Sequence, residues 1–554
     1  MSARYDAVVI GGGHNGLIAA AYLARGGLRT LVLERRHVLG GAAVTEEVVP
    51  GFRFSVASYV VSLLRPEIIR ELDLPGHGLH ILPLDGTFTP LLPGSGPTRR
   101  TGANGVPGSG DYLWRVNDHG RTVRELRRWS LRDADAYEEY GLLMVEMAKF
   151  IKPILGLLPP DPTGWDPREF IGLAGLARDF GRLPEREQAV FVQLMTMPSA
   201  DFLDQWFETD PLKATMSASG IIGTYLGIRS PGTAYVLLHH YMGEIDGAFR
   251  AWGIPKGGTG GISEAIGRAA QAQGAEIRTE APVARVRTRD GRATGVVLES
   301  GEEIEADAVV STADAKVTFL DLLDGGTLDR DFEAEIRRFK FRGSSGKVNL
   351  ALDRLPEFTS LPNAEDLEHL RGAISLSPST DDMERAYDDA KYGRPSAKPY
   401  VDMIIPTLVD PSMAPPGKHV LSCFVQYAPY HLDPSLGTWD DNREAFGDTV
   451  VDRIAEFAPN IREAIVGRQV LTPLDIERTI GLTEGNIFQG ELSLEQLFFN
   501  RPVPGYARFR TPIRDLWLAG SSTHPGGGIM GANGRLAALE VLRAQGGRSA
   551  GVRP

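Results

Sequence analysis

Apolar and polar residues near the N-terminus follow a strand–turn–helix–strand pattern. Residues 5–10 (YDAVVI) and 30–33 (TLVL) are short apolar runs, and residues 15–25 (NGLIAAAYLAR) are a longer run of small and apolar residues between glycines. Short continuous apolar runs with β-branched residues are typical of strands buried on both faces, whereas the longer run indicates a helix. We therefore expect a β–α–β unit at the start of the chain.

A second set of apolar runs lies between residues 252 and 311. A glycine-rich turn at 257–261 precedes a predicted helix at 262–273, and short strands follow at 283–288, 294–298 and 304–306. Asp290-Gly291 and Ser300-Gly301 are typical of the hairpin turns that join such strands. Two more runs predict buried strands at 308–311 and 516–519, the last of which is followed by a glycine turn and a terminal helix.

The segments between these runs differ in character. From about 130 to 250 the pattern is mostly helical and rich in aromatic residues, and Ser130 with Asp133 predicts a capping box at the start of one helix. Residues 336–500 are mixed and contain no cofactor motif. We therefore expect the two ends of the chain and the 250–335 region to form one α/β unit.

Charge and cysteine count exclude several functions. The 554 residues include 59 Lys+Arg and 71 Asp+Glu, and the net charge of −12 argues against a nucleic-acid binder, which needs a basic surface. The single cysteine, Cys423, excludes an intramolecular disulfide, a thiolate zinc cluster and a CxxC redox pair. No HExxH or comparable spacing predicts a metal site. These features favour a reducing, cytoplasmic compartment.

Contact with a membrane is expected at the surface only. The longest apolar stretch, residues 140–160, is broken by four residues, Glu146, Lys149, Lys152 and Pro153, so it is not a spanning segment. Five arginines lie within residues 121–132, which predicts either a solvated helix face or contact with anionic lipid headgroups. We expect peripheral association, where it occurs, to use one of these two segments.

The N-terminal turn has the spacing of a dinucleotide-binding fingerprint. Gly11, Gly13 and Gly16 form a GxGxxG motif that follows a predicted strand and opens a predicted helix. In such a turn the glycines allow a tight bend and a close approach of pyrophosphate to the helix N-terminus. Glu34 ends the second strand, where an acidic residue binds an adenosine ribose.

The motif alone does not decide between NAD and FAD. Glu34 suits both and disfavours the 2′-phosphate of NADP, although Arg35 weakens that last argument. Two features favour FAD. The pair Gly40-Gly41 follows Glu34 and is placed to meet the same pyrophosphate, and the glycine turn at 520–534 is placed to hold the other half of an extended cofactor.

Longer stretches around these motifs resemble a known group of flavoproteins. VVIGGGHNGLIAAAYLARGG, VLERRHVLGGAA and LWLAGSSTHPGGGIMGANGR resemble the FAD-dependent superfamily of phytoene desaturases, retinol saturases and amine oxidases. The resemblance is strongest to the phytoene-dehydrogenase-related branch called pyridine nucleotide-disulfide oxidoreductase domain-containing protein 2, and runs from end to end. The name of that branch does not describe its chemistry here, because disulfide reductases need a cysteine pair.

The resemblance implies an FAD site built from both ends of the chain. The ADP half would lie on the N-terminal turns, Val283 would contact adenine through its backbone, and the C-terminal turn would follow the ribityl chain and flavin. The implied residues are Gly11, Gly13, Asn15, Gly16, Glu34, Arg35, Gly40, Gly41, Ala42, Val283, Gly520, Ser521, Gly528, Ile529, Met530 and Asn533.

Two departures from the pattern count against an amine oxidase. Many relatives have arginine where this chain has Ala42, and amine oxidases have Asp or Glu where it has Ser521. Near the presumed flavin end, His524 is our candidate for moving a proton, with packing of the glycine turn as its alternative role. His239 and His240 lie in an apolar, aromatic-rich segment and are expected to line a core or a pocket.

We therefore expect an α/β protein with two domains. A Rossmann-like FAD-binding domain would comprise residues 1–70, 250–335 and 500–554, and a mixed α+β substrate domain would comprise 71–249 and 336–499. The resemblance implies an FAD-dependent oxidoreductase that acts on a hydrophobic isoprenoid, polyene or acyl-type substrate by dehydrogenation, saturation or isomerisation. The alternatives are an FAD-dependent amine oxidase and a flavoprotein that mainly binds a partner or membrane.

Overall fold

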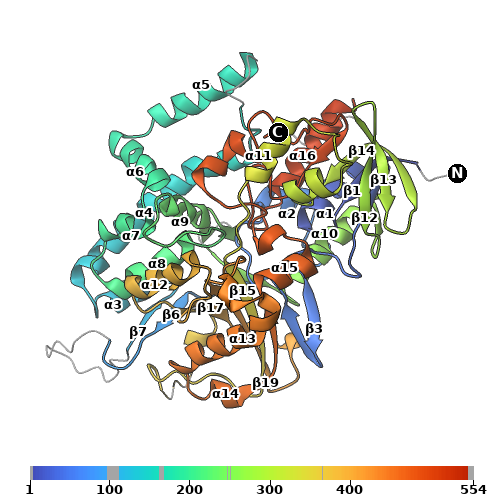
Figure 1. The fold of residues 1–554 in the computed structure, drawn as a ribbon. Helices are drawn as coiled ribbons and strands as arrows, with labels where there is room; N and C mark the ends of the chain where they lie inside the picture. Colours follow the sequence, from blue (N-terminus) through green and yellow to red (C-terminus); the bar gives the residue numbers. More distant parts are fainter. Residues whose placement is uncertain are drawn as a thin grey trace.

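The computed structural model describes residues 4–95, 111–160, 167–245, 248–249, 251–362, 364 and 366–546. Figure 1 shows three parts: a sheet with helices near the two termini, a layer of helices beside it, and a second sheet below both. Among the described residues, every helix is too short or too polar to cross a membrane.

The first sheet has seven strands and draws on three distant segments of the chain. Its order is β11-β2-β1-β14-β13-β12, and β20 pairs with β14. The strands β1, β2, β11, β14 and β20 are parallel where they pair, whereas β12, β13 and β14 form an antiparallel meander. The strands are β1 (Arg4–Ile10), β2 (Thr30–Leu33), β11 (Glu276–Arg278), β12 (Val283–Arg289), β13 (Arg292–Leu298), β14 (Glu303–Ser311) and β20 (Leu516–Leu518).

One strand of this sheet differs from our prediction. Residues 304–306 and 308–311, expected as two strands, form the single strand β14. Its exposed residues Glu303, Glu305 and Asp307 alternate with buried ones, so the acidic residue between the two apolar runs points to solvent and does not end the strand. Asp307 pairs there with Arg4 of β1.

Helices from both ends and from the middle of the chain cover one face of the first sheet. The helix α1 (His14–Arg25) packs against α10 (Gly260–Ala272) and α16 (Ala532–Ala544) in one apolar cluster. The contact with α16 is close, because a Cβ added to Gly534 would lie 2.2 Å from the carbonyl oxygen of Asn15. This crossing brings the N-terminal and C-terminal glycine turns together.

The second sheet also has seven strands, in the order β19-β15-β18-β17-β16-β6-β7. All neighbours are antiparallel except β6 and β16. One face packs in an apolar cluster with α13 (Trp439–Ala455) and α14 (Ile461–Ala464). The strands are β6 (Thr87–Pro90), β7 (Tyr112–Arg115), β15 (Ser345–Leu352), β16 (Ala373–Leu376), β17 (Tyr400–Ile404), β18 (His419–Gln426) and β19 (Ile465–Leu471).

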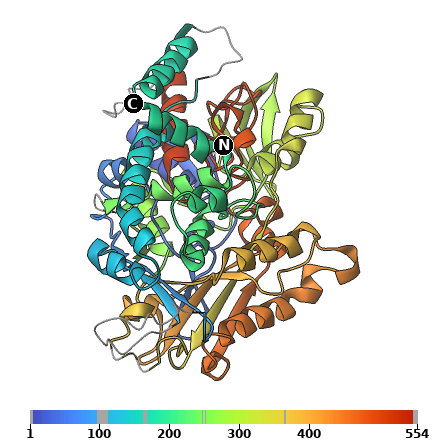
Figure 2. The same cartoon turned by 90° about the vertical axis from the view of Figure 1, so that its left-hand side faces the viewer.

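The helical layer covers the other face of the second sheet (Figure 2). The Ser130 hydroxyl caps α4 by accepting a hydrogen bond from Asp133 N at 3.1 Å, but the Asp133 carboxylate accepts from Glu208 N and Thr209 N, so only half of the predicted capping box forms. The helices are α3 (His119–Leu126), α4 (Leu131–Ile151), α5 (Pro167–Gly181), α6 (Glu185–Thr196), α7 (Ser199–Asp204), α8 (Asp210–Ser217) and α9 (Thr233–Tyr241).

Candidate active site

A cavity of about 740 Å³ lies where the three parts meet. Ser521, Gly528 and Ile529 of the C-terminal turn border it on one side, and residues of the helical layer and the second sheet border it on the others. Exposed lining residues mark its entrance between β7, α3 and α4; they are Asn117, His119, Glu138 and Leu142. A molecule entering there has access to the C-terminal turn through the interior.

The N-terminal turn has the geometry that its motif predicts. Gly13 is the N-cap of α1, and a Cβ added to it would make only ordinary contacts with Gly40 and Gly41, 3.9 and 4.0 Å away. A Cβ at Gly16 would lie 2.0 Å from Gly11 O, so that glycine is needed for the strand and helix to meet. The three motif glycines and the second glycine pair therefore surround one open position at the start of α1.

Glu34 lies directly against this turn. Its carboxylate accepts hydrogen bonds from Gly12 N at 2.7 Å and from Arg36 N at 2.9 Å, and the side chain is buried. The amide of Ala281 donates to Glu34 O, which places the start of β12, where Val283 lies, beside the end of β2. Arg35 points elsewhere and donates to two carbonyl oxygens of α15 (Pro473–Ile480).

The C-terminal turn meets the N-terminal turn through side chains. Asn15 Nδ2 donates to Ser521 Oγ at 3.2 Å across 506 positions of sequence. Gly528 has a φ of +116° and Ile529 a φ of +54°, so the turn has an unusual backbone at the cavity wall. A Cβ added to Gly520 would lie 2.6 Å from Thr312 O, so a side chain does not fit there. The Met530 carbonyl accepts a hydrogen bond from Arg65 N.

Several buried polar atoms around the two turns have no partner among the described residues. They include His14 Nε2, Asn15 Oδ1 and Asn533 Oδ1. Buried polar atoms nearly always have hydrogen-bond partners, so these atoms fit a polar ligand lying between the turns. His14 and Ala42 also line the cavity, and burial lowers the pKa of His14 to about 4, so its imidazole is neutral. The residues present therefore fit FAD.

His524 lies behind the turn and is not a lining residue of the cavity. Its Nε2 lies 3.1 Å from Ile154 O, and burial lowers its pKa to about 4. Asn533 Nδ2 donates to the His524 carbonyl at 3.2 Å. These contacts are those of a side chain that packs the turn, and proton transfer by His524 stays a prediction.

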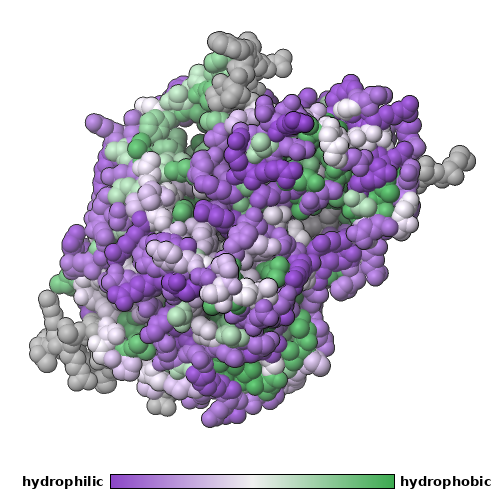
Figure 3. Space-filling model, in the orientation of Figure 1, coloured by the Kyte–Doolittle hydropathy of each residue, from purple (hydrophilic) through white to green (hydrophobic). Residues whose placement is uncertain are grey.

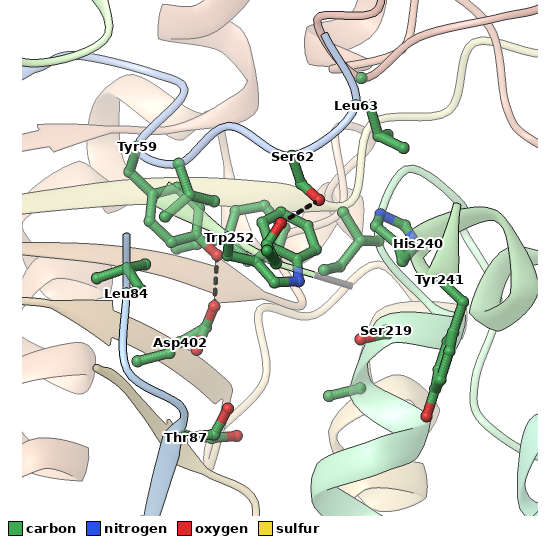
Figure 4. A pocket seen from close by; sticks show the side chains of 18 of the residues that line it. Tyr59, Ser62, Leu63, Leu84, Thr87, Ser219, His240, Tyr241, Trp252 and Asp402 are labelled. Atoms are coloured by element: carbon green, nitrogen blue, oxygen red, sulfur yellow. Dashed lines mark hydrogen bonds between the residues drawn. The ribbon is translucent and has the colours of Figure 1, made fainter. Parts of the chain in front are cut away.

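His240 lines the cavity, as expected for that segment. Its ring stacks on Trp252 with centroids 6.0 Å apart, and both residues are labelled in Figure 4. Nδ1 of His240 lies 2.9 Å from Val236 O. Burial lowers its pKa. Trp252, Tyr241 and Phe488 give this side of the cavity an apolar, aromatic surface.

The opposite wall contains a buried ionisable cluster that sequence reasoning missed. Lys347 of β15 and Asp402 of β17 both stand opposite Phe424 of the strand between them. Lys347 Nζ donates to Ser422 Oγ at 2.6 Å and lies 4.3 Å from the ring centroid of Tyr59. The Tyr59 hydroxyl donates to Asp402 Oδ2 at 2.5 Å (Figure 4).

Burial perturbs both charged groups of this cluster. It lowers the pKa of Lys347 to about 7 and raises that of Asp402 to about 6, because each charged form loses hydration. Perturbed groups in a cavity are candidates for function. The available signal in the sequence was the alternation of Ser345, Lys347 and Asn349 with apolar residues, which places polar side chains on one face of a strand.

Among the described residues, no group of three or more His, Cys, Asp or Glu side chains is arranged to hold a metal ion. Cys423 is buried in β18, and burial raises its pKa to about 12. This thiol is poorly suited to nucleophilic or redox chemistry.

Comparison with known proteins identifies the family. Residues 198–542 match the model of flavin containing amine oxidoreductases, and residues 9–70 match that of the NAD(P)-binding Rossmann-like domain. The chain is 42% identical to pyridine nucleotide-disulfide oxidoreductase domain-containing protein 2 of Rattus norvegicus, over 98% of this chain and 94% of that protein.

More distant relatives and a solved structure agree over nearly the full length. Phytoene desaturase (lycopene-forming) of Pseudescherichia vulneris is 26% identical over 95% of this chain and 96% of its own. Prolycopene isomerase 2 of an Oncidium hybrid cultivar is 25% identical over 95% and 81%, respectively. An oxidoreductase from Methanosarcina mazei has the same fold, with a TM-score of 0.60, 18% identity and coverage of 97% of this chain and 99% of that one.

The predicted α/β fold, with its Rossmann-like FAD-binding part, and the predicted resemblance are both confirmed. The chain belongs to the flavin-containing amine oxidoreductase family and is an FAD-dependent oxidoreductase of the amine oxidase and phytoene desaturase superfamily.

Proposed function

We propose that this chain acts on a hydrophobic isoprenoid, polyene or acyl-type molecule, by dehydrogenation, saturation or isomerisation. The main support is the cavity that begins at the C-terminal turn and is lined by large apolar side chains, among them Leu63, Tyr241, Trp252 and Phe488. A mostly apolar pocket with a few polar groups suits a substrate of this class.

FAD would lie between the two glycine turns. The residues we propose for its ADP half are Gly11, Gly13, Gly16, Glu34, Gly40, Gly41 and Val283, and those for its flavin half are Ser521, Gly528, Ile529 and Asn533. When bound there, FAD supplies the hydride-accepting chemistry. The chain's own contribution is to orient the substrate along the cavity and to exclude water with its aromatic wall.

We also propose that one domain binds FAD and the other binds the substrate. Residues 1–70, 250–335 and 500–554 would hold FAD, because they contain the first sheet and both glycine turns. Residues 71–249 and 336–499 would shape the substrate cavity, because they contain the helical layer and the second sheet.

Amine oxidation is the second candidate, since the family model takes its name from that reaction. The buried carboxylate of Asp402 is a group that an ammonium ion would favour, but Lys347 stands on the same wall and opposes a second cation. The apolar lining and this lysine favour the first candidate.

Anaerobic reduction of the bound flavin distinguishes the two. Hydrophobic isoprenoid or acyl compounds should bleach the flavin absorbance, or reoxidise reduced flavin, faster than simple primary amines do. Rapid bleaching by amines with no response to lipids would establish the amine oxidase. Bound FAD that responds to neither class would favour a binding protein.

Membrane association is not part of this proposal. The arginines of residues 121–132 include three that pair with acidic side chains, Arg121 with Glu368, Arg128 with Glu125, and Arg132 with Glu208. Much of the apolar stretch 140–160 is packed in the core of the helical layer. The face in Figure 3 is mostly hydrophilic, with apolar residues near the projecting helix α5, and nothing in the structure shows what covers them.

A further inference from the structure

The second-sheet wall of the cavity differs from the rest of its lining. Tyr59 contacts both Lys347 and Asp402 there, and Ser375 lies opposite Asp402 on the next strand. The wall across the cavity is aromatic and aliphatic. A cavity for a pure hydrocarbon gains nothing from a buried lysine and a buried aspartate, whose loss of hydration is costly.

The lysine retains donors for a ligand. An ammonium or amine nitrogen carries more than one hydrogen, and Ser422 Oγ is the one hydrogen-bond acceptor that Lys347 Nζ has among the described residues. The ring face of Tyr59 covers part of the nitrogen. Because Lys347 lines the cavity, a ligand there can supply the missing acceptor.

The charges around the cavity indicate that this acceptor is neutral. Basic and acidic side chains balance in the described lining, and Asp402, the acid of this cluster, shares the Tyr59 side chain with Lys347. A ligand carboxylate placed between Lys347 and Asp402 would be attracted by Lys347 and repelled by Asp402. It would also lose its own hydration. The charged lining residues are Lys347, Arg115, Asp402 and Glu138, with histidines His14, His119 and His240.

We propose that Lys347, supported by Tyr59 and Asp402, binds a neutral oxygen of an otherwise apolar substrate, as found in a ketone or an alcohol. The inference rests on the proposed function and narrows its substrate class from hydrocarbons and acids to oxygenated apolar molecules. Tyr59 would act as a positioning residue, because it contacts Lys347 with its ring and Asp402 with its hydroxyl.

Four probes of equal chain length test this on the FAD-loaded protein: 2-undecanone, 1-undecanol, undecane and undecanoate. Binding is followed by the perturbation of the flavin absorption spectrum and by tryptophan fluorescence, without turnover. The free energy of removing a given probe from water is the same for every variant. The ratio of the wild-type Kd to the variant Kd for that probe therefore reports the contact made by the substituted side chain. Lys347→Met removes the donors and keeps the bulk, and Lys418→Met, at an exposed position, is the matched control.

Lys347→Met should weaken binding of the ketone and the alcohol about 10-fold, which is the size of one hydrogen bond from a buried charged donor. It should leave undecane unchanged or bound more tightly, and Lys418→Met should change none of the four. Asp402→Asn, which keeps the shape and a polar partner for Tyr59, should improve undecanoate binding by removing a negative charge.

Unchanged ketone and alcohol binding in Lys347→Met would overturn the inference, as would a larger loss for undecanoate than for the ketone. If undecane binds as tightly as the ketone and Lys347→Met changes the Kd of neither probe, the inference fails and the proposed function stands. If none of the probes binds and amines reduce the flavin, the proposed function fails with it.

Discussion

At the scale of single residues, Glu34 connects the N-terminal glycine turn to the end of the second strand. One oxygen of its carboxylate accepts from Gly12 N and the other from Arg36 N. This buried carboxylate fixes the turn, and in the proposed FAD site it would also accept a hydrogen bond from the adenosine ribose. Its two roles make it a sensitive position for FAD affinity.

Glu34→Ala should raise the Kd for FAD at least about 10-fold, because hydrogen bonds to a charged group contribute roughly 1.5–3 kcal/mol. Glu34→Gln keeps one acceptor oxygen and should have a smaller effect. The measurement is titration of apoprotein with FAD, followed by quenching of flavin fluorescence. Equal Kd values for the wild type and Glu34→Ala would show that the ribose is held elsewhere.

Lys347 predicts a particular dependence of stability on pH. Burial lowers its pKa to about 7 in the folded protein, against 10.5 as its ordinary value, so between these values the unfolded chain binds the extra proton. The free energy of unfolding should therefore rise with pH across this window, by about 1 kcal/mol per pH unit from this group. Burial raises the pKa of Asp402 to about 6, so the folded chain binds the extra proton between about pH 4 and 6. This group therefore lowers the free energy of unfolding as the pH rises through that lower range.

The measurement is denaturant unfolding of the wild type and Lys347→Met at pH 7, 8 and 9. The stability of the wild type relative to the variant should increase with pH, because the variant lacks the titrating group. A flat difference across these three values would contradict the lowered pKa.

Residues fixed by a turn were predictable, and residues brought together by the second sheet were not. The spacing of Gly11, Gly13 and Gly16 is enough to predict a tight turn between a strand and a helix. Lys347 and Asp402 are separated by 55 positions, and their proximity depends on β15 and β17 both pairing with β18. Register between strands far apart in sequence cannot be read from a single chain, so the cluster was missed.

At the scale of elements, the crossing of α1 and α16 joins the two ends of the chain. Gly534 allows the helices to touch, and Asn15 and Ser521 then meet beside the cavity. The β–α–β unit and the hairpins were predicted because their signals are local. The continuity of β14 was mispredicted because Asp307 interrupts the apolar pattern while remaining on the exposed side of its alternation.

Gly534→Ala should destabilise the protein by about 1–3 kcal/mol, because the added methyl overlaps a backbone oxygen at the crossing. It should also loosen FAD, since the turn that follows Ser521 leads into α16. The matched control is Gly175→Ala in α5, where a Cβ meets nothing within 4 Å. Thermal unfolding and the flavin content of each variant are measured, and a neutral Gly534→Ala would contradict the close crossing.

At the scale of the whole molecule, the chain folds around the cavity described above. Its walls come from the three segments that build the first sheet and from the two segments that form the helical layer and the second sheet. The C-terminal glycine turn borders it on one side, and its exposed lining residues lie between β7, α3 and α4. The family's fold was predictable from motifs at both ends of the chain. The cavity was not, because its walls come from all three parts of the structure.

The same arrangement predicts no disulfide reductase activity. Cys423 is the single cysteine, it is buried on the side of β18 that packs in the core, and burial raises its pKa to about 12. Cys423→Ala should leave flavin reduction unchanged and cost about 1 kcal/mol of stability, as expected for loss of a small buried side chain. Steady turnover of a disulfide with NADH or NADPH would contradict this account.

The central claim is that the two ends of the chain build one FAD site. A Cβ at Gly13 makes only ordinary contacts, so Gly13→Val should fold while its methyl groups occupy the space between the turns. Gly528→Asp adds bulk and negative charge at the cavity wall, where a Cβ would lie 2.6 Å from Leu63 Cδ1. Gly325→Val, at an exposed position with nothing within 4 Å of the added Cβ, is the control.

The direct measurement is the ratio of FAD to protein after purification, with circular dichroism to check the fold. Wild type and Gly325→Val should carry about one FAD per chain, whereas Gly13→Val and Gly528→Asp should each lose most of it with the secondary structure retained. Full FAD in a folded Gly528→Asp would remove the C-terminal turn from the site, and full FAD in Gly13→Val would contradict the account as a whole.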